Sequence, residues 1–163
     1  MSSWDAADGV SQFIVEGRGN RGNASYVSYY SCVSNKSSCA IPGVACGESL
    51  TMMITAFNDD CYSETVLGQE TNTAPCVPQT LLPINDCSSD SITLTWSTAN
   101  GALFYIASVT DSLGGQYSCS TTNLNCQITG LRCGTTYNAT IISSNYKCNS
   151  SVSNKITVDT GTL

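Results

Sequence analysis

Short runs of alternating apolar and polar residues, or of β-branched and aromatic residues, recur along the chain, and almost no stretch shows the helical period of about 3.6 residues. Clear examples are residues 26–30 and 92–96, each of which stands between turn-forming residues. Many short strands at this spacing predict an all-β protein made of β-sandwiches.

The second half of the sequence contains a complete set of strands for one sandwich. We expect strands at residues 78–84, 91–96, 103–109, 116–119, 126–129, 136–144 and 152–160.

Four cysteine positions occur twice with the same spacing. Six, six and fourteen residues separate the members of each set, and the second set lies 87 positions after the first: Cys32, Cys39, Cys46 and Cys61, then Cys119, Cys126, Cys133 and Cys148. This spacing predicts a duplicated unit. We place the two domains at residues 1–74 and 75–163, and two prolines in the joint, Pro75 and Pro78, predict a stiff, extended link.

The charge of the chain argues against several classes of partner. The 163 residues include 6 Lys and Arg, 12 Asp and Glu and no His, which gives a net charge of −6. This balance disfavours nucleic acid and anionic membranes, both of which attract clustered Lys and Arg. No apolar run is long enough to span a bilayer.

The cysteine content indicates the compartment. Ten cysteines without a CxxC pair favour structural disulfides over zinc or redox chemistry. Disulfides persist in oxidising compartments, so we expect a secreted or cell-surface protein. Residues 1–4 lack the basic start and apolar stretch of a signal peptide, and we therefore expect a mature chain or a fragment.

Several residues of the second half resemble a fibronectin type III repeat. The family's corner motif Leu-x-Pro-Gly-Thr-x-Tyr matches residues 131–137, with Cys133 in place of proline. Trp96 and Tyr105 stand where that fold has core residues. The resemblance implies that Tyr137 ties the corner by a hydrogen bond from its hydroxyl to the backbone.

The first half resembles the same family more weakly. Residues 44–50 match the corner, with Leu50 where tyrosine is expected. Cys61 and Cys148 occupy a loop that usually carries glycine, a feature similar to a cysteine-rich subset of these repeats found in tandem arrays of extracellular proteins. The resemblance implies two tandem fibronectin type III-like sandwiches and is weak for function, because this fold hosts many roles.

The spacing of the cysteines suggests some pairings and excludes another. Cys32–Cys39 and Cys119–Cys126 each flank a short turn that allows a disulfide. If Tyr137 opens a strand, Cys133 and Cys148 lie about 30 Å apart at its two ends and need other partners. We expect three further candidate bonds, of which the last competes with the second: Cys87–Cys133, Cys76–Cys148 and Cys46–Cys76.

The first domain is predicted to be incomplete. Trp4 corresponds to Trp96, yet three residues precede it, so the first strand and most of the second are missing. Three explanations stay open: the chain is a fragment of a longer array, a neighbouring chain completes the domain in a head-to-tail filament, or the domain is simply reduced.

Four N-x-S/T sequons could accept N-linked glycan in a secretory pathway. Their asparagines fall in predicted loops, apart from one that points outward from a strand: Asn23, Asn35 and Asn149, then Asn138.

Catalytic and metal chemistry find little support. Without histidine, no Ser-His or Cys-His pair exists. Residues 17–22 match GxGxxG, but strand-like residues follow where a nucleotide site needs a helix, so we read a hairpin loop. Asp59, Asp60, Asp86 and Asp90 lack the spacing of a calcium loop. We expect no enzymatic activity and no cofactor.

Two functions remain. The first is a structural or adhesive segment of an extracellular array or filament, with other copies of the chain as partners. The second is a recognition module that binds a protein or glycan through loops at one pole. Those loops, at residues 5–9, 59–63, 97–101 and 145–150, look small and polar, which disfavours recognition.

Overall fold

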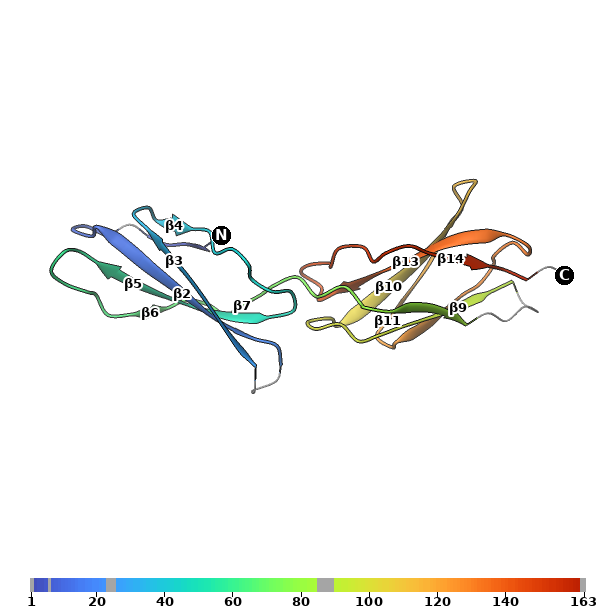
Figure 1. The fold of residues 1–163 in the computed structure, drawn as a ribbon, viewed down its shortest axis with the longest axis horizontal. Helices are drawn as coiled ribbons and strands as arrows, with labels where there is room; N and C mark the ends of the chain where they lie inside the picture. Colours follow the sequence, from blue (N-terminus) through green and yellow to red (C-terminus); the bar gives the residue numbers. More distant parts are fainter. Residues whose placement is uncertain (1, 6, 23–25, 85–89, 162–163) are drawn as a thin grey trace. The chain divides into compact units, whose positions relative to one another are not determined.

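The structure, a computed structural model, describes residues 2–5, 7–22, 26–84 and 90–161 (Figure 1). It is all-β, as the sequence predicts, and the described residues include no helix. The chain divides into two compact units, unit 1 (Met1–Thr73) and unit 2 (Ala74–Leu163).

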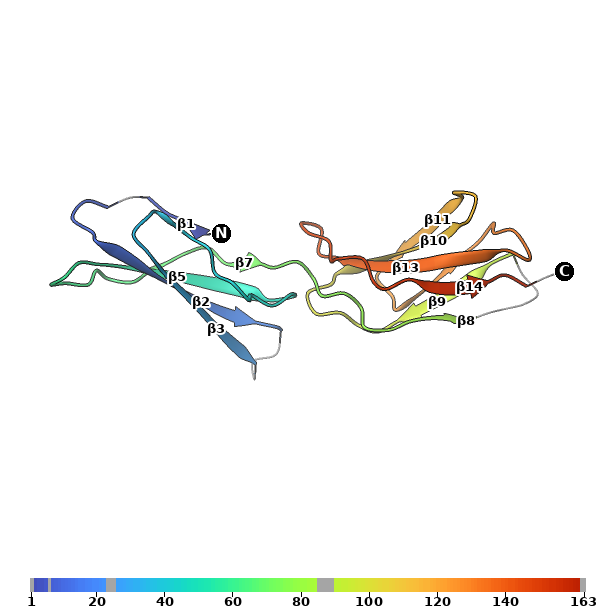
Figure 2. The same ribbon diagram turned by 45° about the horizontal axis from the view of Figure 1, so that its top comes forward.

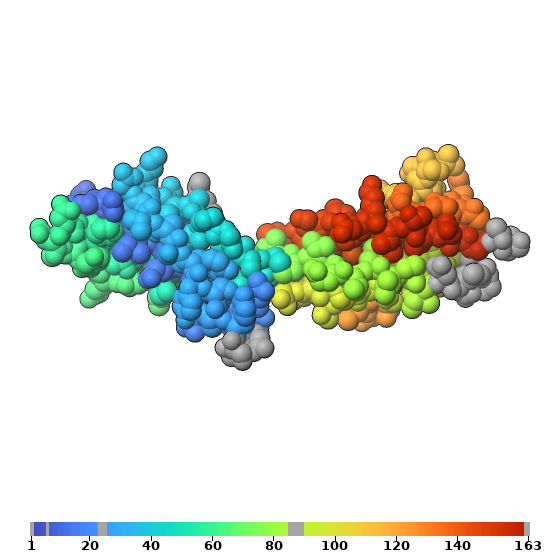
Figure 3. Space-filling model, viewed as in Figure 1, coloured from blue at the N-terminus to red at the C-terminus, as the bar shows by residue number. Residues whose placement is uncertain are grey.

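Unit 2 is a sandwich of two antiparallel sheets (Figure 2). Its strands are β8 (Leu81–Ile84), β9 (Ile92–Trp96), β10 (Phe104–Asp111), β11 (Gln116–Thr121), β12 (Asn125–Ile128), β13 (Thr136–Ser144) and β14 (Ile156–Asp159). One sheet has the order β11-β10-β13-β14, and the other has the order β12-β9-β8. The edge strands β8 and β14 belong to different sheets, and the segments that contain them lie side by side on the face shown in Figure 3.

The core of unit 2 forms where alternate residues of the two sheets meet. In β10, Tyr105, Ala107 and Val109 are buried, and in β9 the same alternation buries Leu94 and Trp96. The rings of Trp96 and Tyr105 lie 5.7 Å apart. Period-two alternation therefore places both aromatic residues in the core, as predicted.

The corner before β13 is held by Tyr137. Its side chain is fully buried, and the backbone N–H of Arg132 donates a hydrogen bond of 2.9 Å to its hydroxyl. The predicted tie between the tyrosine hydroxyl and the backbone is present, and it fixes the loop that carries Cys133.

Unit 1 has one large sheet and a very small second one. Its strands are β1 (Ser2–Ser3), β2 (Gln12–Asn20), β3 (Val27–Ser34), β4 (Ser38–Cys39), β5 (Ser49–Phe57), β6 (Val66–Leu67) and β7 (Thr71–Asn72). The large sheet has the order β3-β2-β5-β6, with β7 also paired to β5. The small sheet consists of β1 and β4, two residues each.

The two short-range disulfides that the loops predict are present. Cys32–Cys39 and Cys119–Cys126 have Cα–Cα distances of 6.4 Å and 6.3 Å.

Two of the three further candidate bonds are absent. Cys61, Cys133 and Cys148 are exposed free thiols, so the expected bonds Cys87–Cys133 and Cys76–Cys148 are not formed. Cys46 and Cys76 are each disulfide-bonded, and Cys87 lies outside the described residues. Cys133 and Cys148 flank the long strand β13, which separates their thiols by far more than a disulfide spans.

Prediction: Tyr137→Phe should lower the unfolding free energy of unit 2 by about 1 kcal/mol, because the N–H of Arg132 loses its acceptor. Denaturant unfolding followed by Trp96 fluorescence, in a Trp4→Phe background, measures the loss. Tyr146→Phe, at a side chain that is 75% exposed, is the matched control and should change little. Equal stability of the two variants would contradict the role of the corner.

Candidate functional site

The large sheets of the two units have matching registers. In unit 1, Val15 pairs with Cys32 on one side and with Ile54 on the other. In unit 2, Ala107 pairs with Cys119 and with Ile141 in the same way. Each inner-face residue of β2 and β5 therefore has a counterpart in β10 and β13.

The matching inner faces differ in how well they are covered. In unit 2, Ala139 and Ile141 are 0% and 1% exposed, because β9 packs over them. Their counterparts in unit 1, Met52 and Ile54, are only half-buried. The inner face of unit 1 is thus a sandwich face with part of its cover missing.

The cover that unit 1 does have comes from β1 and Trp4. The ring of Trp4 packs edge-on against Phe13, with centroids 5.2 Å apart. Beside this contact lies an apolar hollow of about 200 Å³, lined by Ser2, Ser3, Trp4, Val15, Met52, Met53, Ile54, Val66 and Gly68. We call the half-buried inner-face residues Met52 and Ile54, with this hollow, the open face of unit 1.

A second hollow of about 220 Å³ continues the open face toward the corner before β5. It is lined by Ser2, Tyr30, Ile41, Val44, Leu50, Met52 and Thr71. The apolar lining of the hollow beside Trp4 is unfavourable in water and favours contact with another apolar element.

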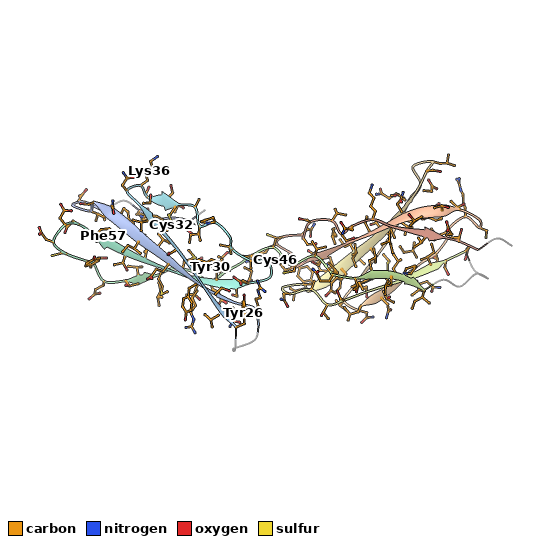
Figure 4. All side chains as sticks on the ribbon, in the orientation of Figure 1. Tyr26, Tyr30, Cys32, Lys36, Cys46 and Phe57 are labelled. Carbon is orange, nitrogen blue, oxygen red and sulfur yellow. A yellow bond between two sulfur atoms is a disulfide. The ribbon has the colours of Figure 1, made fainter. Side chains whose placement is uncertain are left out.

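A buried carboxylate closes the far end of unit 1. Glu48 is 1% exposed and accepts hydrogen bonds from the side chains of Ser28 (2.8 Å), Tyr30 (2.7 Å) and Arg21 (3.2 Å). The Arg21 guanidinium also lies 4.8 Å from the ring centre of Tyr26. Figure 4 shows Tyr26 and Tyr30 on this half of the unit and Phe57 near its opposite end.

Two differences from unit 2 accompany this carboxylate. Gly19 stands where unit 2 has Asp111, and a Cβ at Gly19 would collide with Oε2 of Glu48. Leu50 stands where unit 2 has Tyr137, so the corner has no tyrosine hydroxyl of its own. The hydroxyl of Tyr30 takes the place of the missing tyrosine hydroxyl and accepts a hydrogen bond of 3.2 Å from the N–H of Ala45.

The hydrogen bonds of Glu48 decide its protonation. Burial alone would raise the pKa of its carboxyl, but hydrogen bonds from Tyr30, Ser28 and Arg21, and the charge of Arg21, hold that pKa below the ordinary 4.5. The carboxylate is therefore charged at neutral pH and anchors the replacement corner.

Equivalent loops follow β5 and β13 and present the free thiols of Cys61 and Cys148. The side-chain oxygens of Asn58 and Asn145 accept the N–H groups of these cysteines at 2.9 and 2.8 Å. Each loop also presents an exposed tyrosine that packs on a phenylalanine of the same unit. The ring of Tyr62 stacks on Phe57 with centroids 5.5 Å apart, and the ring of Tyr146 lies tilted on Phe104 with centroids 4.8 Å apart. These loops, predicted to be small and polar, thus carry exposed aromatic rings.

The other sites suggested by the sequence stay separate. The asparagines Asn35, Asn138 and Asn149 are exposed, and Asn23 lies outside the described residues. Residues 17–20 of the GxGxxG match lie within β2, not in the hairpin loop that we expected. Asp59, Asp60 and Asp90 are exposed, and Asp86 lies outside the described residues.

The described part of the chain contains no group of three or more metal-ligating side chains and no helix able to cross a membrane.

Sequence reasoning missed the Glu48 cluster. Its signal was the loss of the corner tyrosine at Leu50, which leaves a backbone N–H in need of another acceptor. Finding Tyr30 as that acceptor requires the pairing of β2 with β3, which the sequence does not show directly.

Comparisons with known proteins point to one domain type. The chain is 33% identical over 102 residues to human "Fibronectin type III domain-containing protein 7", covering 61% of this chain and 13% of that protein. It is 26% identical over 135 residues to the mouse protein of the same name, covering 83% and 17%. The chain thus spans less than a fifth of the length of these relatives.

A solved structure supports the fold. The two-domain fibronectin type III segment of chicken tenascin superposes with a TM-score of 0.58 at 16% identity, covering 95% of this chain and 87% of that one. No protein-family model matches the sequence.

Prediction: unit 1 should lose stability on acidification in a way that depends on Glu48. Because the folded pKa of Glu48 is depressed, its stabilisation is present above pH 4.5 and is lost as pH falls through the folded pKa. Glu48→Gln should cost about 1–3 kcal/mol at pH 7, since charged hydrogen bonds are lost, and should flatten the pH dependence.

Denaturant unfolding followed by Trp4 fluorescence, in a Trp96→Phe background, measures this effect between pH 7 and pH 3. Glu16→Gln, on the exposed face of β2, is the matched control. An unchanged pH profile in Glu48→Gln would show that the carboxylate does not stabilise unit 1.

Proposed function

Because the chain is built of cysteine-rich fibronectin type III repeats, we propose that it is a non-enzymatic extracellular structural module that works within an array of such repeats. Within the array, the open face of unit 1 receives a strand pair of the kind formed by β8 and β9. The exposed sequons at Asn35, Asn138 and Asn149 suit N-linked glycan on such a surface.

The observation that carries this proposal is the register of β1. Ser2 pairs with Cys39, as Leu94 of β9 pairs with Cys126. A strand that continued β1 in the N-terminal direction would therefore occupy the position of Ile92 and lie over the open face. Ile92 is 1% exposed in unit 2, which shows how fully such a residue is buried there.

Covering the open face is also energetically favourable. Covering Met52 and Ile54 as completely as Ala139 and Ile141 removes apolar area from water, and each added core side chain contributes about 1.5–3 kcal/mol. An added strand also pairs with β1 or with the edge of β4, which leaves fewer backbone groups unpaired.

Recognition of a ligand is the second candidate. Tyr62 and Tyr146 are 72% and 75% exposed on equivalent loops, and each ring is held by a neighbouring phenylalanine. Rigid exposed tyrosines supply contact area at low entropic cost, which suits a protein or glycan ligand.

Prediction: a grafted chain should stabilise unit 1. Residues 78–95, with Cys87→Ser, are placed directly before Trp4 in place of residues 1–3. The graft should raise the unfolding free energy of unit 1 by about 3 kcal/mol, because its apolar residues cover the open face. Trp4 fluorescence in a Trp96→Phe background reports the transition.

The matched control is the same graft with Leu94→Asp, which places a charge at a position that is fully buried in unit 2. This control should lose the gain in the unfolding free energy of unit 1. A graft that leaves the stability of unit 1 unchanged, or a control that stabilises equally, would contradict strand acceptance by the open face.

Prediction: if the tyrosine loops bind glycan, the wild-type protein should bind members of an immobilised glycan array, and Tyr62→Ala with Tyr146→Ala should lose most of that signal. Tyr29→Ala, at an exposed tyrosine of β3, is the control and should bind as the wild type does. Binding that survives loss of both loop tyrosines, or no binding by the wild type, would count against glycan recognition.

A further inference from the structure

Tyr62 lies in a long exposed segment that carries carboxylates close to it. Every residue from 58 to 72 is exposed. Asp59 and Asp60 precede Tyr62 by three and two positions, and Glu64 follows it by two. Within the part of the chain that the structure describes, none of these carboxylates forms an ion pair. Their negative charges therefore stay uncompensated beside the tyrosine.

The ring of Tyr62 is held in place while its hydroxyl stays accessible. The ring stacks on Phe57, the last residue of β5 (Figure 4). The side chain is 72% exposed, and its hydroxyl has no hydrogen-bond partner among the described residues. In contrast, the hydroxyls of the better-buried tyrosines Tyr30, Tyr105 and Tyr137 all take part in hydrogen bonds. Tyr62 thus offers an accessible oxygen nucleophile on a fixed ring.

Tyr62 is also the one tyrosine of the sequence with acidic neighbours along the chain. Of the eight tyrosines, no other has Asp or Glu within five residues on either side. No Lys or Arg occurs between Lys36 and Arg132. On the equivalent loop of unit 2, Tyr146 is 75% exposed and also packs on a phenylalanine, but Lys147 follows it directly. The two loop tyrosines therefore match in exposure and differ in the charge around them.

We propose that Tyr62 is a site of tyrosine O-sulfation. The proposal rests on the proposed extracellular function, because sulfate is transferred to tyrosine in the lumen of the secretory pathway. A sulfotransferase that binds acidic acceptor segments through Lys and Arg is steered to this loop by its carboxylates. The exposed loop also lets the phenol enter the active site of another protein without unfolding of the sheet.

The transfer is a substitution at sulfur and involves no oxidation or reduction. The phenol oxygen of Tyr62 attacks the sulfur of an adenosine phosphosulfate, which is a mixed anhydride of phosphate and sulfate. The new bond joins the phenol oxygen to sulfur, and the bond between sulfur and the bridging oxygen breaks, so the nucleotide leaves as a phosphate. A base of the transferase takes the phenol proton, because the neutral phenol is a weak nucleophile.

Sulfation changes the charge of the loop and leaves its packing intact. The sulfate ester adds a permanent negative charge and further acceptor oxygens beside Asp59, Asp60 and Glu64. Because the side chain of Tyr62 is exposed, the added group meets solvent and not the core. The product suits a partner surface that carries Arg, since Arg forms paired hydrogen bonds with oxyanions.

Sulfate incorporation into the purified full chain tests the site. The chain is incubated with a tyrosylprotein sulfotransferase and with phosphoadenosine phosphosulfate that carries radioactive sulfur, and the labelled peptides are mapped. We expect the label on the peptide that contains Tyr62. Tyr62→Phe, which keeps a ring beside Phe57, should lose nearly all of the label, whereas Tyr146→Phe should keep it.

Neutral variants of the carboxylates test why this tyrosine is chosen. Asp59→Asn combined with Asp60→Asn and Glu64→Gln should lower the labelling rate about tenfold at low salt, because the loop no longer attracts a basic active site. Glu16→Gln, on the exposed face of β2, is the matched control and should be labelled at the wild-type rate. Trp4 fluorescence checks that each variant is folded.

Three outcomes would overturn the proposal: no label in the wild-type chain, equal labelling of Tyr146 and Tyr62, or labelling of the triple variant at the wild-type rate. The graft on unit 1 measures stability and leaves residues 58–64 unchanged. Failure of strand acceptance is therefore recognised separately from failure of sulfation.

Discussion

A β-sandwich is stable only when both of its sheets cover one core, and this requirement governs the whole chain. In unit 2, β8, β9 and β12 cover the large sheet, and Ala107, Val109 and Ala139 are completely buried. In unit 1 the large sheet is equally regular, but most of the cover on its inner face comes from β1 and β4, which have two residues each. The hollows beside Trp4, the half-buried Met52 and the proposed strand acceptance all follow from that imbalance.

Unit 1 also shows how one lost group is replaced by several others. Where the corner tyrosine becomes Leu50, Tyr30 from β3 supplies the hydroxyl, and Glu48 fixes that hydroxyl from the space above Gly19. The backbone N–H of Ala45 needs a hydrogen-bond acceptor, and in unit 1 that acceptor is a hydroxyl held by the charged Glu48. The two hydrogen bonds between Thr73 and the backbone of Glu48 recur in unit 2 between Thr160 and Thr135, so this part of the corner is kept in both units.

The sequence predicts the strands, the duplication and the corner of Tyr137, because these depend on local periodicity, spacing and one motif. It predicts the bonds Cys32–Cys39 and Cys119–Cys126 because short turns bring the thiols together. It does not predict the Glu48 cluster, which depends on strand register across 18 to 27 residues of chain. The state of Cys133 was also missed, since a free thiol and a bonded one look the same in sequence.

Acceptance of a further strand by unit 1 requires that its open face be less well packed than the matching face of unit 2. Native-state hydrogen exchange at the matched positions Ile54 and Ile141 measures it directly, because an amide in a poorly covered strand opens at lower free energy. The account predicts clearly faster exchange at Ile54 than at Ile141 in the same sample. Equal protection of the two amides would show that unit 1 is closed without further strands and would contradict the account.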